Sequence, residues 1–247
     1  MNEQVDFLNR CFETCGLTLT ERQTEQFLKY TRLLTEWNRV MNLTAITDQE
    51  EVVRKHFVDS CIPLAFSAYS ASFEGGKLLD VGTGAGFPGV PLKILRPDLA
   101  VTLMDSLDKR IRFLGAVTEE LGLSDMTLVH GRAEELGRKP DFREQFTTVV
   151  SRAVASLPVL LEYALPFTAP GGLFLAYKGA DADEEIRKAR KAAVLLGGSA
   201  AESKSFVLPG SDYGRSLIAY RKTRTTPNRY PRGGGAIRKK PLGREES

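Results

Sequence analysis

The sequence predicts an α/β protein with a mostly parallel, seven-stranded sheet and a cap of helices before it. From Lys77 onward, short apolar runs alternate with segments of helical periodicity, which is the pattern of a doubly wound sheet. The first apolar run ends in a glycine-rich turn, and the second ends in a single carboxylate, Asp105. Residues 1–75 show helical periodicity alone.

The N-terminal segment, 1–75, is expected to form the helical cap. Thr20 and Gln23 have the spacing of a capping box, in which side chain and backbone bond reciprocally at a helix start. One face of this helix is then expected to carry Phe27, Tyr30, Leu34 and Trp37. A second capping box is expected at Thr47 and Glu50. Small and polar residues over 70–76 indicate a linker.

Residues 76–222 are expected to form the sheet domain, followed by a basic tail over 223–247. Strands are expected over 77–81, 101–105, 126–130, 146–151, 172–178, 202–208 and 215–221. Helices are expected to begin near Pro88, Asp108, Ala133, Leu157 and Asp181. Because only residues 209–212 separate the last two strands, we expect these strands to pair as an antiparallel hairpin.

The glycines after the first strand, Gly82, Gly84 and Gly86, are spaced as G-x-G-x-G. Glycine lets the backbone approach a ligand closely, and a carboxylate at the end of the next strand, here Asp105, accepts hydrogen bonds from ribose hydroxyls. A dinucleotide-binding G-x-G-x-x-G motif would require glycine where the chain has Phe87. The loop is similar instead to the S-adenosylmethionine loop of class I methyltransferases. A dehydrogenase is the less favoured alternative.

Further candidates stand at the other strand ends, where open α/β sheets bind their ligands. Glu134 either contacts the adenine of a cofactor or stabilises its helix start through the helix dipole. Phe87 either contacts the cofactor or packs its helix against the sheet. Arg152 ends an apolar strand and therefore faces either an anionic ligand, which we favour, or a core carboxylate. No metal is expected, because His56 and Asp59 lie one helical turn apart without a third ligand.

Charge is unevenly distributed along the 247 residues, whose formal net charge is +3. Residues 221–247 contain nine Lys or Arg and two Glu, a net charge of +7, which leaves −4 for the rest of the chain. A basic tail indicates a polyanionic partner such as nucleic acid, with a solvated terminus as the alternative. The glycines at 233–235 predict a flexible hinge within the tail.

Composition favours a cytoplasmic protein. Apolar residues make up 42% of the chain and charged residues 26%, and no apolar run is long enough to cross a membrane. The first residues have neither the basic start nor the apolar core of a signal peptide. Three cysteines without a framework spacing fit reduced thiols.

Five motifs occur in an order typical of one bacterial family. They lie at 37–45 (WNRVMNLTA), 56–60 (HFVDS), 80–93 (DVGTGAGFPGVPLK), 131–135 (GRAEE) and 151–154 (SRAV). With these motifs the whole chain resembles the ribosomal RNA small subunit methyltransferase G family, also called glucose-inhibited division protein B. The resemblance implies a Rossmann-like class I methyltransferase that uses S-adenosylmethionine to methylate guanine N7 in the 16S rRNA loop near the decoding centre.

The resemblance also implies that Gly82, Phe87, Ala133, Glu134 and Arg152 line the cofactor site. Beside these residues we expect Gly84 to shape the loop and Asp105 to bind the ribose. Contacts to RNA phosphate are expected from Lys93, Arg238, Lys239 and Lys240. No side chain is expected to act as an essential catalytic base.

The expected partner is 16S rRNA or the small ribosomal subunit, with neither a membrane nor a second copy of the chain involved. Two other functions remain open. A small-molecule methyltransferase would be active without RNA and would have no use for the basic tail. A ribosome-binding module would bind S-adenosylmethionine without turnover.

Overall fold

The computed structural model describes residues 2–243. The strands are β1 (Lys77–Val81), β2 (Ala100–Asp105), β3 (Met126–His130), β4 (Phe146–Arg152), β5 (Thr168–Gly179), β6 (Glu202–Val207) and β7 (Gly214–Arg221). They form one sheet in the order β3-β2-β1-β4-β5-β7-β6. The first five strands are mutually parallel, and β7 pairs antiparallel with both β5 and β6. The seven expected strands and the closing hairpin are therefore confirmed.

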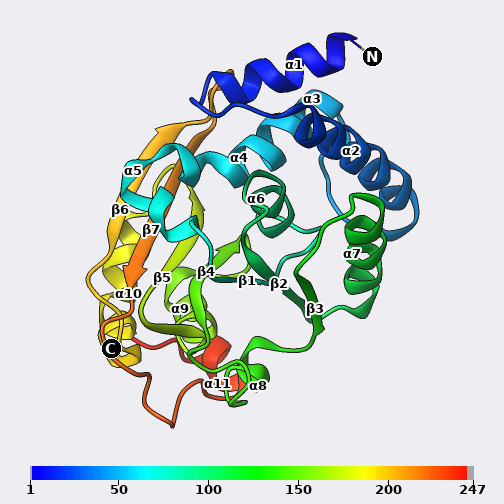
Figure 1. Ribbon diagram of the computed structural model, residues 1–247. Helices are drawn as coiled ribbons and strands as arrows, with labels where there is room; N and C mark the ends of the chain where they lie inside the picture. Colours follow the sequence, from blue (N-terminus) through cyan, green and yellow to red (C-terminus); the bar gives the residue numbers. More distant parts are fainter. Residues whose placement is uncertain (1, 244–247) are drawn as a thin grey trace.

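Helices cover both faces of this sheet (Figure 1). The α-helices are α1 (Asn2–Glu13), α2 (Glu21–Met41), α3 (Gln49–Val52), α4 (Asp59–Cys61), α5 (Ser67–Ser70), α6 (Gly89–Leu95), α7 (Asp108–Glu120), α8 (Ala133–Leu136), α9 (Leu157–Ala164), α10 (Asp183–Leu196) and α11 (Gly234–Lys239). A π-helical segment, Val53–Val58, joins α3 to α4, and 3-10 turns occupy Ile62–Ala65 and Ala71–Phe73.

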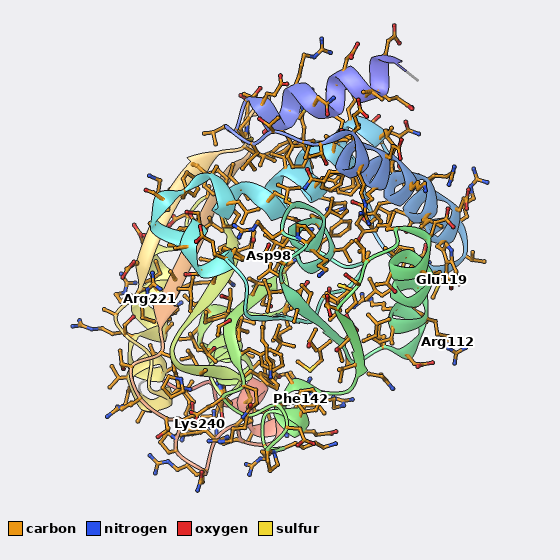
Figure 2. All side chains as sticks on the ribbon, viewed as in Figure 1. Asp98, Arg112, Glu119, Phe142, Arg221 and Lys240 are labelled. Carbon is orange, nitrogen blue, oxygen red and sulfur yellow. The ribbon has the colours of Figure 1, made fainter. Side chains whose placement is uncertain are left out.

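The strands β1 to β5 and β7 each contribute to two apolar cores, because successive side chains point to opposite faces. Leu78 of β1 belongs to the core that contains side chains of α1, α2, α6 and α7, whereas Leu79 belongs to the core that contains side chains of α9 and α10. This two-sided burial explains why the strands read as continuous apolar runs. Side chains fill both layers, while charged groups such as Arg112 and Glu119 lie on the outer side of α7 (Figure 2).

Local signals placed most helix starts correctly. The capping box at Thr20 and Gln23 is present, with both reciprocal hydrogen bonds made. The expected box at Thr47 is wrong by one residue, because the N-cap is Asp48, whose carboxylate accepts a hydrogen bond from the backbone N–H of Glu51. The linker expected over 70–76 is mostly helical, since Ala71–Phe73 forms a 3-10 turn.

The basic tail is packed against the protein as far as residue 243. Tyr230 and Ile237 are buried, and α11 begins within the three glycines. The expected flexible hinge at 233–235 is therefore wrong: Gly233 is the N-cap of α11, and a side chain at Gly234 would collide with Glu134. Among residues 2–243, no helix combines the length and hydropathy that spanning a membrane requires.

Candidate functional site

The glycine loop between β1 and α6 is organised by a buried carboxylate. Asp80 is fully buried, and its Oδ2 accepts hydrogen bonds from the Thr83 hydroxyl (2.7 Å) and the Gly89 N–H (2.8 Å). Burial raises the pKa of Asp80 to about 6, with the two hydrogen bonds acting in the opposite direction. Asp80 therefore fixes both ends of the loop around the glycines.

The loop glycines are required by conformation and by space. Gly82, Gly84 and Gly86 have φ values of 71°, 63° and 99°, in the left-handed region that side chains other than glycine rarely adopt. A Cβ on Gly82 would lie 2.6 Å from the Val154 side chain. The N-terminal cap also reaches this loop, because the Tyr30 hydroxyl donates a hydrogen bond to the Ala85 carbonyl.

Asp105 joins three neighbouring segments at the end of β2. Its carboxylate accepts hydrogen bonds from the backbone N–H groups of Gly84 and Leu107, both at 2.9 Å, and forms a salt bridge with Arg110 at 3.1 Å. The side chain is 2% exposed. Asp105 therefore ties the glycine loop to the turn that starts α7.

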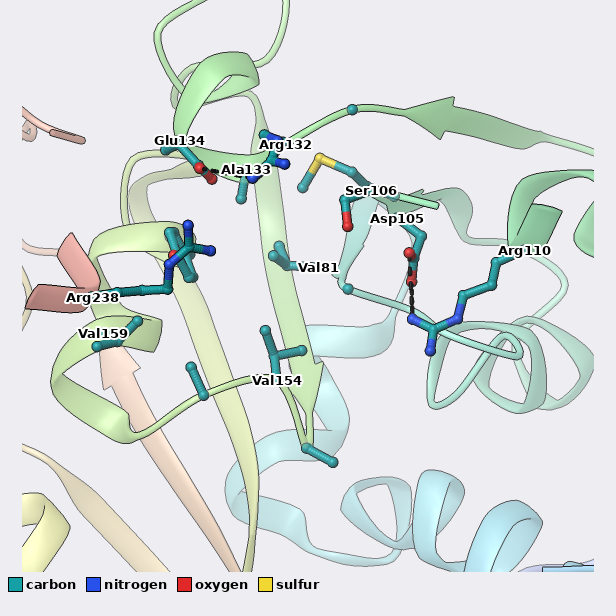
Figure 3. A pocket seen from close by; sticks show the side chains of 16 residues that line it. Val81, Asp105, Ser106, Arg110, Arg132, Ala133, Glu134, Val154, Val159 and Arg238 are labelled. Carbon is teal, nitrogen blue, oxygen red and sulfur yellow. Dashed lines mark hydrogen bonds and ion pairs between the residues drawn. The ribbon is translucent and has the colours of Figure 1, made fainter. Parts of the chain in front are cut away.

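A first cavity of about 330 Å³ opens beyond the ends of β1, β2 and β3 (Figure 3). Four of the predicted cofactor residues line it, namely Gly82, Asp105, Ala133 and Glu134. Arg238 also lines it, although α11 comes from the basic tail and we expected this residue to contact RNA. The side chain of Glu134 is 11% exposed and lies 3.9 Å from the Arg132 guanidinium.

A second cavity, of about 460 Å³, adjoins the first. Both are lined by Gly82, Arg110 and Ala153, so the two cavities meet at the glycine loop. The other predicted cofactor residues, Gly84, Phe87 and Arg152, lie in the second cavity. The structure thus divides the predicted set between two connected spaces.

His56, on the π-helical segment, lines the second cavity. Its ring stacks on Phe87 with centroids 4.4 Å apart and planes inclined by 16°. Nδ1 lies 3.3 Å from Nη2 of Arg152, and Nε2 lies 2.8 Å from the Thr44 hydroxyl. Because a guanidinium can only donate, we assign Nδ1 as an acceptor and the proton to Nε2. Burial, with a further contribution from Arg152, lowers the pKa of His56 to about 3, so the ring is neutral.

Asp59, like His56 a residue of the HFVDS motif, pairs with Arg152. The guanidinium donates to Asp59 at 2.7 Å and to the Lys55 carbonyl at 3.1 Å, and Arg215 donates to the second Asp59 oxygen at 3.2 Å. Asp59 is 3% exposed. Arg152 therefore both lines the cavity and pairs with a buried carboxylate. We had treated these as alternatives.

The sequence argument did not assign His56 and Asp59 a role in this site. It considered the pair only as possible metal ligands, and the helical spacing could not show that β4 brings Arg152 between them. The available signal was the HFVDS motif itself. The lining of the second cavity includes one carboxylate, Asp59, and five cations: Lys55, Arg110, Arg152, Lys178 and Arg215. Each of these cations also pairs with a carboxylate, which is Asp59 for Arg152 and Arg215 and lies outside the lining for the other three.

The phosphate contact expected of Lys93 is wrong. This residue is 1% exposed, and its ammonium donates to the carbonyls of Pro97 (2.9 Å) and Leu99 (2.5 Å) inside the fold. Lys239 at the end of α11 and Lys240, its C-cap, are exposed and stay predicted RNA contacts.

Comparison with known proteins relates the chain to one family. The profile of the family described as rRNA small subunit methyltransferase G matches residues 23–212. A protein of Lachnoclostridium phytofermentans is 51% identical over 231 residues, which are 94% of each chain. One of Alkaliphilus metalliredigens is 49% identical over 229 residues, 92% of this chain and 94% of its own. Both are named ribosomal RNA small subunit methyltransferase G.

Solved structures with little sequence similarity share the fold. A protein of Methanococcus maripaludis, described as an S-adenosyl-L-methionine-dependent methyltransferase, superposes with a TM-score of 0.54 at 14% identity and covers 81% of this chain and 94% of its own. An O-methyltransferase of Bacillus cereus gives 0.53 at 17% identity and covers 78% and 91%. The predicted class I methyltransferase fold is confirmed.

Proposed function

Because the chain belongs to the rRNA small subunit methyltransferase G family, we propose that it transfers a methyl group from S-adenosylmethionine to N7 of a guanine in 16S rRNA. The target is the loop near the decoding centre. The observation that carries this proposal is the pair of cavities that meet at the glycine loop. One has the residues of a nucleoside site, and the other has the charge of a site for a nucleic acid.

The first cavity suits the adenosine part of the cofactor. Asp105 supplies a buried carboxylate that can accept hydrogen bonds from ribose hydroxyls, and Glu134 can accept one from the adenine amino group. The backbone at Gly82 lines both cavities, so the sulfur end of the cofactor would lie near their junction. When bound, the cofactor supplies a sulfonium methyl group as the electrophile.

The second cavity suits the acceptor nucleotide. Guanine N7 in a paired RNA helix faces a deep, narrow groove, so the target base must come from a loop or be turned out of its stack. The excess of cations around the second cavity favours the phosphates that flank such a base. Phe87 and His56 also line this cavity, and their rings stack on each other.

The chain's contribution to the chemistry is alignment. Guanine N7 carries a free lone pair and no proton, so no residue has to remove a proton before or during transfer. The neutral His56, with its acceptor nitrogen occupied by Arg152, is unsuited to that task in any case. The rigid loop and the buried Asp59–Arg152 pair instead hold the two substrates in a reactive arrangement and keep water out.

The test is mass mapping of 16S rRNA from cells that lack this protein, with methylation of small subunits from those cells by the purified protein and labelled S-adenosylmethionine. We expect the loss of one methyl group on a guanine in that loop and its restoration in vitro. Binding to subunits without methyl transfer would favour the ribosome-binding module. Transfer to a small molecule with unchanged rRNA would favour the small-molecule enzyme.

A further inference from the structure

The C-terminal segment 223–243, here called the strap, is fixed across the sheet face that α9 and α10 cover. Arg143 donates hydrogen bonds to the carbonyls of Thr226 (2.6 Å), Pro227 (3.3 Å) and Tyr230 (2.9 Å). Three carbonyls within residues 226–230 of the strap therefore share one guanidinium. Figure 1 shows the end of the strap, α11, beside α8 and α9.

Two further contacts fix α11 at the first cavity. Arg232, just before the helix, forms a two-pronged salt bridge with Glu162 of α9, whose side chain is fully buried, with a closest distance of 2.7 Å. Ile237 is fully buried in the core that contains α9. The close approach of Gly234 to Glu134 leaves no space for a side chain between α11 and α8.

This docking places Arg238 in the wall of the first cavity. Its side chain extends from α11 toward the space below Glu134 and beside Val159 (Figure 3). Tyr163 also lines this wall, and the positive charge of Arg238 lowers the pKa of the Tyr163 hydroxyl against the larger effect of burial. Within residues 2–243, Arg238 forms no hydrogen bond or salt bridge, so its five N–H donors are available to a ligand.

We propose that Arg238 positions the cofactor by contacting its adenine ring. The inference rests on the proposed function, because it takes S-adenosylmethionine as the ligand of the first cavity. Adenine offers ring nitrogens that accept hydrogen bonds and a π face on which a guanidinium stacks, whereas its amino group needs an acceptor such as Glu134. Arg238 and Glu134 line the same end of the cavity and supply both kinds of partner.

The experiment measures cofactor binding without RNA. Isothermal titration calorimetry with S-adenosylmethionine compares the wild type with Arg238→Ala and with Lys191→Ala, an exposed cation on α10 that lines neither cavity. We expect Arg238→Ala to weaken binding about tenfold and Lys191→Ala to leave binding unchanged. Thermal unfolding without ligand should be alike for all three, because within residues 2–243 the side chain of Arg238 forms no hydrogen bond or salt bridge.

A second measurement tests the same contact through hydrogen exchange of the strap. Hydrogen exchange of residues 229–243 should slow when S-adenosylhomocysteine binds the wild type, and this protection should be lost in Arg238→Ala at the same ligand saturation. Unchanged cofactor affinity in Arg238→Ala, or a loss of rRNA affinity alone, would overturn the inference and leave the proposed function standing. A wild type that binds no S-adenosylmethionine would overturn both.

Discussion

We assign Asp105 two tasks that a single substitution removes together. In the proposed cofactor site its carboxylate would accept hydrogen bonds from the ribose, and it already accepts one from the Gly84 N–H and pairs with Arg110. We expect Asp105→Ala to weaken S-adenosylmethionine binding by roughly 1.5–3 kcal/mol, because a charge-assisted acceptor is lost. Calorimetry checks this value, with Asp108→Ala as the control, since that carboxylate is half-exposed and pairs with Arg112. Unchanged affinity in Asp105→Ala would remove Asp105 from the ribose site.

Two groups near the glycine loop, Asp80 and His56, have displaced pKa values that predict a flat pH profile. Burial raises the pKa of Asp80 to about 6, so its stabilising protonated form is lost as pH rises through 6, and above that pH the carboxylate stays charged. The pKa of His56 is lowered to about 3, so this ring takes up its proton only far below neutrality. Single-turnover methyl transfer at saturating cofactor and RNA should therefore vary little between about pH 7 and 9. A tenfold rise per pH unit would reveal a catalytic base and contradict transfer to N7.

At the level of residues, the sequence predicted those parts of the site that follow from strand ends. Gly82, Asp105 and Glu134 line one cavity because the carboxyl ends of parallel strands meet at one edge of a sheet. The contact of Arg152 with His56 spans 96 positions in sequence, and neither periodicity nor spacing carries information about such a pair.

Among the elements, α11 is held in part by one charged pair, Arg232 with Glu162. Glu162 is fully buried, so Arg232→Ala would leave its charge without a counter-charge, with only the backbone N–H of residue 232 still donating to it, and should lower the free energy of unfolding by about 3 kcal/mol. Urea denaturation measures this loss. The double variant Arg232→Ala, Glu162→Gln should recover part of it, because no unpaired charge then remains inside. Equal losses in the single and double variants would show that the pair contributes through packing alone.

Elements with strong local signals were predicted well, and those set by tertiary contacts were not. The seven strands follow from apolar runs that both sheet faces bury, and the start of α2 follows from a capping box that needs no other part of the chain. The glycines at 233–235 predicted a flexible hinge because glycine has the greatest backbone freedom. In the fold they allow α11 to approach Glu134, a requirement that only the docked structure reveals.

The cations that line the second cavity predict where salt acts on RNA binding. We expect log affinity for rRNA to fall linearly with log salt, and Lys55→Gln to reduce that slope by roughly 0.7–0.9, the value for one phosphate contact. Lys188→Gln is the matched control, because Lys55 and Lys188 each pair with a glutamate four positions earlier at 2.6 Å, and Lys188 lies on α10, away from the cavity lining. Equal slopes in the two variants would exclude Lys55 from the RNA surface.

The walls of the site come from distant parts of the chain. Tyr30 braces the glycine loop from the N-terminal cap, and Arg238 lines the first cavity from the strap. During translation these two residues emerge from the ribosome at widely separated times. A nascent chain with its sheet already folded still lacks one wall of the first cavity until the strap has been synthesised and has docked.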